Sequence, residues 1–157
     1  MPEIDLSRAA LSPDAAKLVG TFLRFEFALK DNGLCPMDGD AAVDWGTVTA
    51  SLRAAFFAAV TASGNANTIL TNPPKKQIVQ NRHLNWQDED PPRNTHELFV
   101  AVRRVRNNLV HGGKAGDPES DPATPDRNLK LIREAQWVVE AALLALPQVQ
   151  ASFEGRY

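Results

Sequence analysis

The sequence predicts an all-α protein, an up-and-down four-helix bundle with long connecting loops. Four segments repeat apolar residues at helical spacing, and each lies between recognisable start and stop signals. No segment alternates apolar and polar residues as a half-buried strand would. The 157 residues, of which 43% are hydrophobic, suffice for one buried core. We therefore expect a single helical domain over residues 1–157, with the bundle body at about residues 12–146.

The first predicted helix begins after Ser12 and ends at Asn32-Gly33. Ser12 is a suitable cap, and Pro13 fits the first turn because its missing amide hydrogen costs nothing there. The inward face carries apolar residues at i, i+4, i+7 and i+11, namely Leu18, Phe22, Phe25 and Leu29. Glu26 and Lys30 are spaced as a solvated ion pair, with an auxiliary polar role beside a cleft as the alternative.

The second predicted helix starts at Asp44 and stops at Gly64, a residue type that favours helix ends. Its inward residues are expected to be Val48, Leu52, Ala55, Phe56 and Ala59. The four prolines and clustered charges of residues 65–93 predict a connection without regular structure, apart from a short helical turn around Ile69. Because so long a connection is unusual in a compact domain, it is either functional or mobile.

Asn94 followed by Glu97 is spaced as a capping box and opens the third predicted helix, which runs to Gly112-Gly113. At about 100° per residue, one face of this helix points toward the bundle. That face carries Leu98, Val102, Val105 and Leu109. A second polar loop, "KAGDPESDPATP", follows the glycines.

The fourth predicted helix begins at Thr124 and Pro125, continues to Leu146 and is stopped by Pro147. Its inner stripe is expected to consist of Ile132, Ala135, Val139, Leu143 and Leu146. Short apolar stretches such as "AALLAL" suit core helices rather than a membrane span, which needs about 18 to 20 apolar residues.

The composition excludes several classes of function. The net charge of −2 argues against nucleic-acid binding by the whole surface, so any such contact must come from a local patch. Cys35 is the only cysteine, and the histidines and carboxylates lack metal spacing, so we expect no disulfide, no metal and no cofactor. The N-terminus lacks the basic start and apolar centre of a signal peptide. We expect a cytoplasmic protein with no membrane partner.

The end of the third helix, "RVRNNLVHGGK" at residues 104–114, concentrates positive charge. Between residues 97 and 114 the cations Arg103, Arg104, Arg106 and Lys114 face Glu97 alone. Whether the less concentrated cations Lys75, Lys76, Arg82 and Arg93 extend this patch as an RNA track or belong to a solvated loop stays open.

Helical spacing gives the polar residues of this patch two different surroundings. Arg106 falls inside an apolar arc, between the bundle face and the shoulder made by Phe99 and Val110. Such an arginine indicates a cleft or a second subunit that covers it. The alternative is that its methylene groups pack along the edge of the core while its guanidinium lies in water. Arg103, Asn107 and His111 form an i, i+4, i+8 stripe further round. His111 alone would also be explained by the partial negative charge of the helix end.

The pattern Arg106-Asn107-x-x-x-His111, at the end of a helix in an all-helical bundle, resembles HEPN domains (higher eukaryotes and prokaryotes nucleotide-binding). "RFEFALKDNGL" in the first helix is also similar to prokaryotic members. The resemblance implies a metal-independent endoribonuclease with Arg106 and His111 as catalytic residues. It also implies a homodimer with a composite site, and in several members a toxin or phage-defence role.

The chemistry of these residue types fits RNA cleavage. Histidine can accept or give the proton in attack of a ribose 2′-hydroxyl on phosphate, and Arg106 offers paired donors to phosphate oxygens. Asn107 would be auxiliary, orienting the imidazole or bonding a phosphate. The remaining polar residues of the patch would bind the RNA, namely Arg103, Arg104, Asn108 and Lys114.

Other functions remain open at this stage. A non-catalytic HEPN module would bind nucleotide, RNA or a protein partner with the same groove, and a helical scaffold would have no ligand. Some toxin members paired with a nucleotidyltransferase carry a tyrosine two positions after the histidine, where this chain has Gly113. This departure argues against a nucleotidyltransferase partner and leaves an antitoxin protein of another kind open as a partner.

Overall fold

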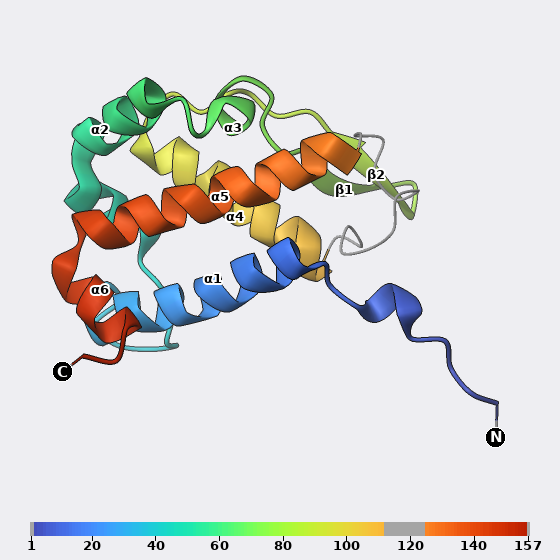
Figure 1. Cartoon of the computed structure of the whole chain (residues 1–157), viewed down its shortest axis with the longest axis horizontal. Coiled ribbons are helices and arrows are strands. Elements are labelled where there is room, and N and C mark those ends of the chain that lie inside the picture. Colours follow the sequence, from blue (N-terminus) through green and yellow to red (C-terminus); the bar gives the residue numbers. More distant parts are fainter. Residues whose placement is uncertain (1, 112–124, 157) are drawn as a thin grey trace.

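The computed structural model describes residues 2–111 and 125–156, and the chain is largely helical (Figure 1). Helices hold 64% of the described residues and strands 7%, so the predicted helical class is confirmed apart from one small hairpin. A 3₁₀ turn at Ser7–Ala9 (η1) precedes the body. The described α-helices are α1 (Pro13–Asp31), α2 (Trp45–Ser63), α3 (Asn67–Thr71), α4 (Thr95–His111), α5 (Pro125–Ala145) and α6 (Pro147–Phe153).

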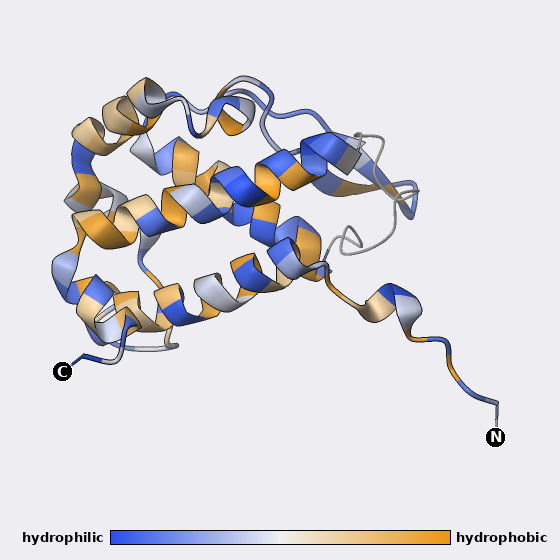
Figure 2. Ribbon diagram, in the orientation of Figure 1, coloured by the Kyte–Doolittle hydropathy of each residue, from blue (hydrophilic) through white to orange (hydrophobic). Residues whose placement is uncertain are grey.

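The four longest described helices pack around one core. α1 packs against α4 and α5, while α2 packs mainly against α4. Hydrophobic and hydrophilic residues alternate around these helices, as burial of one face requires (Figure 2). The largest fully buried side chains come from several helices and include Leu18, Phe22, Phe25, Phe99 and Val139. None of the described helices is both long and apolar enough to cross a membrane.

The predicted helix starts are confirmed where the cap is described. The Ser12 hydroxyl accepts a hydrogen bond from the Ala15 amide at 3.3 Å, and Asp44 accepts one from Thr47 at 3.2 Å. Gly64 ends α2 in the left-handed conformation, with φ 74°. The predicted end of α4 at Gly112-Gly113 and the predicted cap Thr124 lie outside the described residues.

The capping box is only half formed. Asn94 Oδ1 accepts from the Glu97 amide at 2.8 Å, as predicted. The Glu97 carboxylate reaches back to the Arg93 amide at 2.8 Å instead of that of Asn94. Glu97 also binds the Arg93 guanidinium, which explains why it reaches one residue further than the motif requires.

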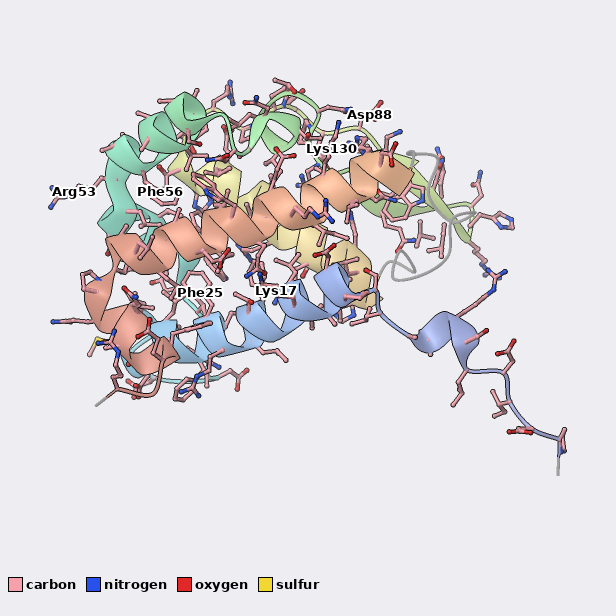
Figure 3. The ribbon with its side chains drawn as sticks, viewed as in Figure 1. Lys17, Phe25, Arg53, Phe56, Asp88 and Lys130 are labelled. Carbon is pink, nitrogen blue, oxygen red and sulfur yellow. The ribbon has the colours of Figure 1, made fainter. Side chains whose placement is uncertain are left out.

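The prediction for the inward face of α2 was wrong at two positions. Ala55 and Ala59 are exposed, whereas Phe56 is buried. The cause is a kink at Arg53, whose backbone has φ 68° and ψ 175° and breaks the helical repeat. The buried Thr95 hydroxyl donates to the Arg53 carbonyl at 2.7 Å, and the Arg53 side chain points out of the body (Figure 3).

The expectation that residues 65–93 contain no strand was also wrong. Two antiparallel strands, β1 (Lys76–Gln80) and β2 (His83–Gln87), form a hairpin beside α4, and α3 provides the predicted helical turn around Ile69. The turn residues Asn81 and Arg82 have φ 52° and 64°, which suits a two-residue hairpin turn. Most hairpin side chains are exposed on both faces, so the strands lack the alternation by which a half-buried strand is recognised.

The chain continues as a helix beyond its predicted end. Pro147 stops α5 as expected but occupies the first turn of α6, where it costs no hydrogen bond. The Arg24 guanidinium donates to the carbonyls of Ser152 and Phe153, both at 3.0 Å. α1 therefore holds the end of α6 in place.

Candidate functional site

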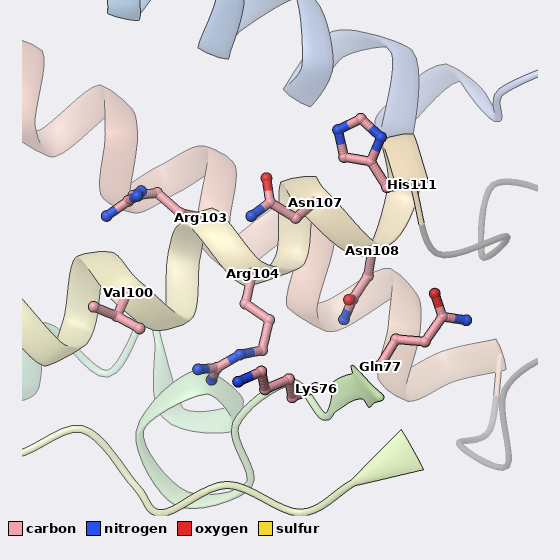
Figure 4. A pocket seen from close by; sticks show the side chains of 8 residues that line it. All are labelled: Lys76, Gln77, Val100, Arg103, Arg104, Asn107, Asn108 and His111. Carbon is pink, nitrogen blue, oxygen red and sulfur yellow. The ribbon is translucent and has the colours of Figure 1, made fainter. Parts of the chain in front are cut away.

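The polar residues of α4 line a groove of about 480 Å³ between this helix and β1 (Figure 4). Its described lining residues are Lys76, Gln77, Val100, Arg103, Arg104, Asn107, Asn108 and His111. Five of the seven residues predicted as a site are thus brought together. Of the other two, Arg106 points elsewhere and Lys114 lies outside the described residues.

Arg103, Asn107 and His111 lie in a row along α4, as their spacing predicts (Figure 4). Residues four apart on a helix lie on one face and are separated by about 6 Å along the axis. Asn107 and His111 are exposed, whereas Arg103 is half-buried. The row therefore places a guanidinium, an amide and an imidazole at successive turns of one wall.

Arg106 points toward α1 instead of into the groove. Its Nη1 lies 2.6 Å from Glu26 Oε1, and its guanidinium lies 4.8 Å from the centre of the Phe22 ring. The apolar arc around Arg106 is thus explained within one chain, since Glu26 supplies the opposite charge. Glu26, predicted to pair with Lys30, pairs with Arg106. Because Arg106 and His111 are five residues apart on a regular helix, their side chains diverge by about 140°.

Arg106 nevertheless contacts the row through its neighbour. Its Nε donates to Asn107 Oδ1 at 2.8 Å, which fixes the orientation of the Asn107 amide. The Asn107 oxygen is therefore occupied, and its NH₂ group is the donor left for another molecule. The ion pair with Glu26 and this bond together form a chain of contacts from α1 to the exposed wall of the groove.

Arg103 has a different environment from the other arginines of α4. Its guanidinium lies 4.7 Å from the centre of the Trp45 ring, and its Nε is buried without a hydrogen-bond partner. Among the described residues, no carboxylate lies within ion-pairing distance of it. Burial lowers the pKa of Arg103, the neighbouring Arg106 cation lowers it further, and Glu26 opposes both effects.

The opposite wall of the groove is built around the hairpin. Arg104 and Lys76 extend toward one another there, and Arg104 Nη2 lies 3.9 Å from Glu89 Oε1 (Figure 4). Asn108, predicted to bind substrate, is only 5% exposed, and its Nδ2 donates to the Lys75 carbonyl at 2.9 Å. Asn108 therefore attaches the start of β1 to α4, and the cations of this wall belong to two segments.

Three contributors to the site were missed or misjudged from the sequence. Gln77 lines the groove because of a hairpin that was not predicted. Trp45, the first residue of α2, contacts Arg103 although it lies more than fifty residues earlier in the chain. Glu26 fits the alternative role of an auxiliary polar residue beside a cleft, although its partner is Arg106. In the sequence, the only local indication of this role is that Glu26 places a carboxylate at the edge of the apolar face of the first helix.

The described residues hold no group of three or more histidine, cysteine, aspartate or glutamate side chains that could hold a metal ion. His96 Nδ1 lies 3.3 Å from the Thr49 hydroxyl, which gives this histidine a structural contact. His83 is the first residue of β2.

Comparison with known proteins found no relative of this chain. No family model matches the chain, and searches among curated proteins and solved structures found no match either.

Proposed function

We propose that this protein is a metal-independent endoribonuclease of the HEPN type, whose groove beside α4 binds the RNA backbone. The observation that carries the proposal is the row of Arg103, Asn107 and His111 along one wall of the groove. A cation and an amide donor suit phosphate oxygens, and an imidazole suits proton transfer. Four long helices around one core are also compatible with a HEPN-type bundle.

In the proposed reaction, a ribose 2′-oxygen forms a bond to the adjacent phosphorus while the bond from phosphorus to the 5′-oxygen breaks. A base removes the proton of the 2′-hydroxyl, and an acid gives a proton to the leaving 5′-oxygen. Donors from Arg103 and Asn107 stabilise the charge on the other phosphate oxygens. The products are a 2′,3′-cyclic phosphate and a 5′-hydroxyl.

One imidazole cannot perform both proton transfers in a single concerted step. Of the three histidines in the sequence, only His111 lines the groove among the described residues. A two-fold homodimer that joins two grooves would supply a second His111 and a second row of donors. We therefore include a homodimer in the proposal.

The proposal gives Arg106 a positioning role. The Arg106 guanidinium is already paired with the Glu26 carboxylate, so its charge is partly neutralised and attracts a phosphate less than the charge of Arg103 does. Through its bond to Asn107 Oδ1, Arg106 directs the Asn107 amide donor toward the groove. Loss of Arg106 would therefore weaken cleavage through the orientation of Asn107.

A second candidate is a non-catalytic RNA-binding module. The observation that favours it is the same Glu26–Arg106 pair, because the arginine of the motif is engaged within its own chain. In either case a toxin or phage-defence role would involve an antitoxin protein that blocks the groove.

The two candidates are separated by the ends of the RNA products. Purified protein is incubated with total RNA in the presence of a chelator, and new ends are examined for cyclic phosphate and 5′-hydroxyl groups. The nuclease proposal expects both, and their loss in His111→Ala. RNA that is bound but unchanged supports the binding module, and RNA that is neither bound nor cleaved contradicts both candidates.

A further inference from the structure

We infer that Trp45 and Arg103 form a pre-organised phosphate site, in which Arg103, and not the arginine of the HEPN-like motif, binds the RNA backbone. That the ligand is RNA rests on the proposed function. That the site takes a phosphate-like anion rests on the contacts of Arg103 itself. Trp45, which no local pattern in the sequence links to α4, is the positioning residue of this site.

Arg103 differs from the paired arginines of the chain. Several arginines lie within 4 Å of a carboxylate, namely Arg93, Arg104, Arg106, Arg133 and Arg156. Arg103 has no such partner among the described residues, although it is half-buried at the groove. Because a guanidinium cannot give up its charge in a protein, a half-buried one without a carboxylate leaves its charge available to an anion.

The donors of Arg103 are incompletely satisfied. Its Nε is buried and has no hydrogen-bond partner among residues 2–111 and 125–156. A buried donor without a partner is uncommon and costs free energy, so such a group deserves a specific explanation. A phosphate in the groove, which Arg103 lines, would supply the opposite charge. Burial and the nearby Arg106 cation both lower the pKa of Arg103, and Glu26 opposes them.

Trp45 holds this guanidinium in one orientation. The cation lies 4.7 Å from the centre of the indole ring, within the range of a cation–π contact. The ring itself is fixed between Phe25 and Phe99, whose centres lie 6.1 Å and 6.0 Å away. A guanidinium stacked on an aromatic face keeps its in-plane N–H groups directed outward, which is the geometry that two phosphate oxygens require.

The surroundings of Arg103 favour a phosphodiester chain over a single small anion. The donor group of Asn107 lies one turn along the same wall, Lys76 comes from β1 on the opposite wall, and Arg104 extends from α4 toward Lys76 (Figure 4). These cations extend the positive surface beyond the space that one phosphate fills. Successive phosphates of a single strand could therefore contact the groove while one of them occupies the Trp45–Arg103 site.

The test measures binding of a single-stranded 2′-O-methyl oligonucleotide, which has no free 2′-hydroxyl and so binds without being cleaved. Affinity is measured by fluorescence anisotropy over a range of salt concentrations. Arg103→Lys keeps the positive charge but loses the planar guanidinium with its paired N–H donors. We expect roughly tenfold weaker binding, with an unchanged slope of log K against log salt. Arg103→Ala should in addition reduce the slope of log K against log salt by about 0.7.

Trp45 is tested with two substitutions. Trp45→Leu should weaken binding by about as much as Arg103→Lys, roughly tenfold, without a change in the salt slope. Trp45→Phe keeps an aromatic face and should recover part of the loss. Circular dichroism checks that both variants remain folded. Arg133→Lys and Trp137→Phe are the matched controls, because Arg133 is paired with Asp14 and neither residue lines the groove.

Wild-type affinity in both Arg103→Lys and Trp45→Leu would overturn the inference, because a diffuse positive surface would then explain binding. Failure of the proposed function is a separate result. If RNA is never cleaved but the Arg103 and Trp45 variants lose binding as expected, the phosphate site stands without the nuclease. If cleavage requires His111 while these variants bind normally, only the phosphate site is lost.

Discussion

Arg106 Nη1 lies 2.6 Å from Glu26 Oε1, which places the arginine of the α4 motif in an ion pair within its own chain. The pair joins two helices, and the Arg106 guanidinium also rests on Phe22 of α1. Arg103, one turn earlier, rests on Trp45 but has no carboxylate partner among the described residues. Two arginines of one helix, both supported by aromatic rings, are thus suited to different tasks, one to hold helices together and one to bind an anion.

The Glu26–Arg106 pair should contribute measurably to stability. The two side chains are only 26% and 18% exposed, so their interaction is less weakened by water than that of a surface pair. In a double-mutant cycle of Glu26→Gln and Arg106→Gln, the coupling in the free energy of unfolding should be roughly 1–2 kcal/mol. Urea denaturation of the four proteins measures it.

The exposed Arg93–Glu97 pair serves as the comparison for this cycle. Its residues are four apart in the chain, with Arg93 just before the start of α4 and Glu97 in its first turn, and the Arg93 side chain is 82% exposed. Its coupling should be clearly smaller and should decrease further as salt is added. Equal coupling in the two cycles would mean that the Glu26–Arg106 pair does not hold α1 to α4.

Asn108 should act on the structure of the groove and not on RNA directly. Asn108→Ala leaves the Lys75 carbonyl without its 2.9 Å partner, and we expect a loss of about 1–3 kcal/mol in the free energy of unfolding. Amide hydrogen exchange in the hairpin should also become faster. The exposed neighbour Asn107→Ala should cost less stability, and a hairpin that exchanges at the same rate in all three proteins would refute the anchoring role.

Arg53 should be a site where glycine stabilises the fold. Its φ of 68° and ψ of 175° lie in a region that glycine adopts far more readily than other residues. The side chain is exposed, so little packing is lost in Arg53→Gly. We expect a gain of roughly 1 kcal/mol and a higher melting temperature. Arg53→Ala should give no such gain, and a lower melting temperature for the glycine variant would show that the kink carries no strain.

The helix limits could be predicted because their causes are local. Ser12, Asp44 and Gly64 each act within three or four residues of the chain, and the structure uses them as expected. The row Arg103, Asn107 and His111 was likewise predictable from spacing on one helix. The predicted residues Ala55 and Ala59 failed because a uniform helical repeat cannot anticipate the kink at Arg53.

The contacts that define the site could not be predicted in the same way. Glu26 and Arg106 are 80 residues apart in the chain, and no local sequence pattern indicates that they pair. The Trp45–Arg103 contact has the same difficulty. The hairpin escaped recognition since Val79 and Leu84, which face one another across the strands, are both 70% exposed and give no buried face.

The most direct test of the central claim, that the His111 row cleaves RNA, is a single-turnover rate. The rate constant is measured with protein in excess over a susceptible RNA, in chelator, for the wild type and for His111→Ala. We predict a loss of about 10²- to 10⁴-fold in the variant with unchanged affinity for the RNA, since a positioned acid or base supplies an acceleration of that size. A variant that cleaves within a few fold of the wild-type rate would contradict the account.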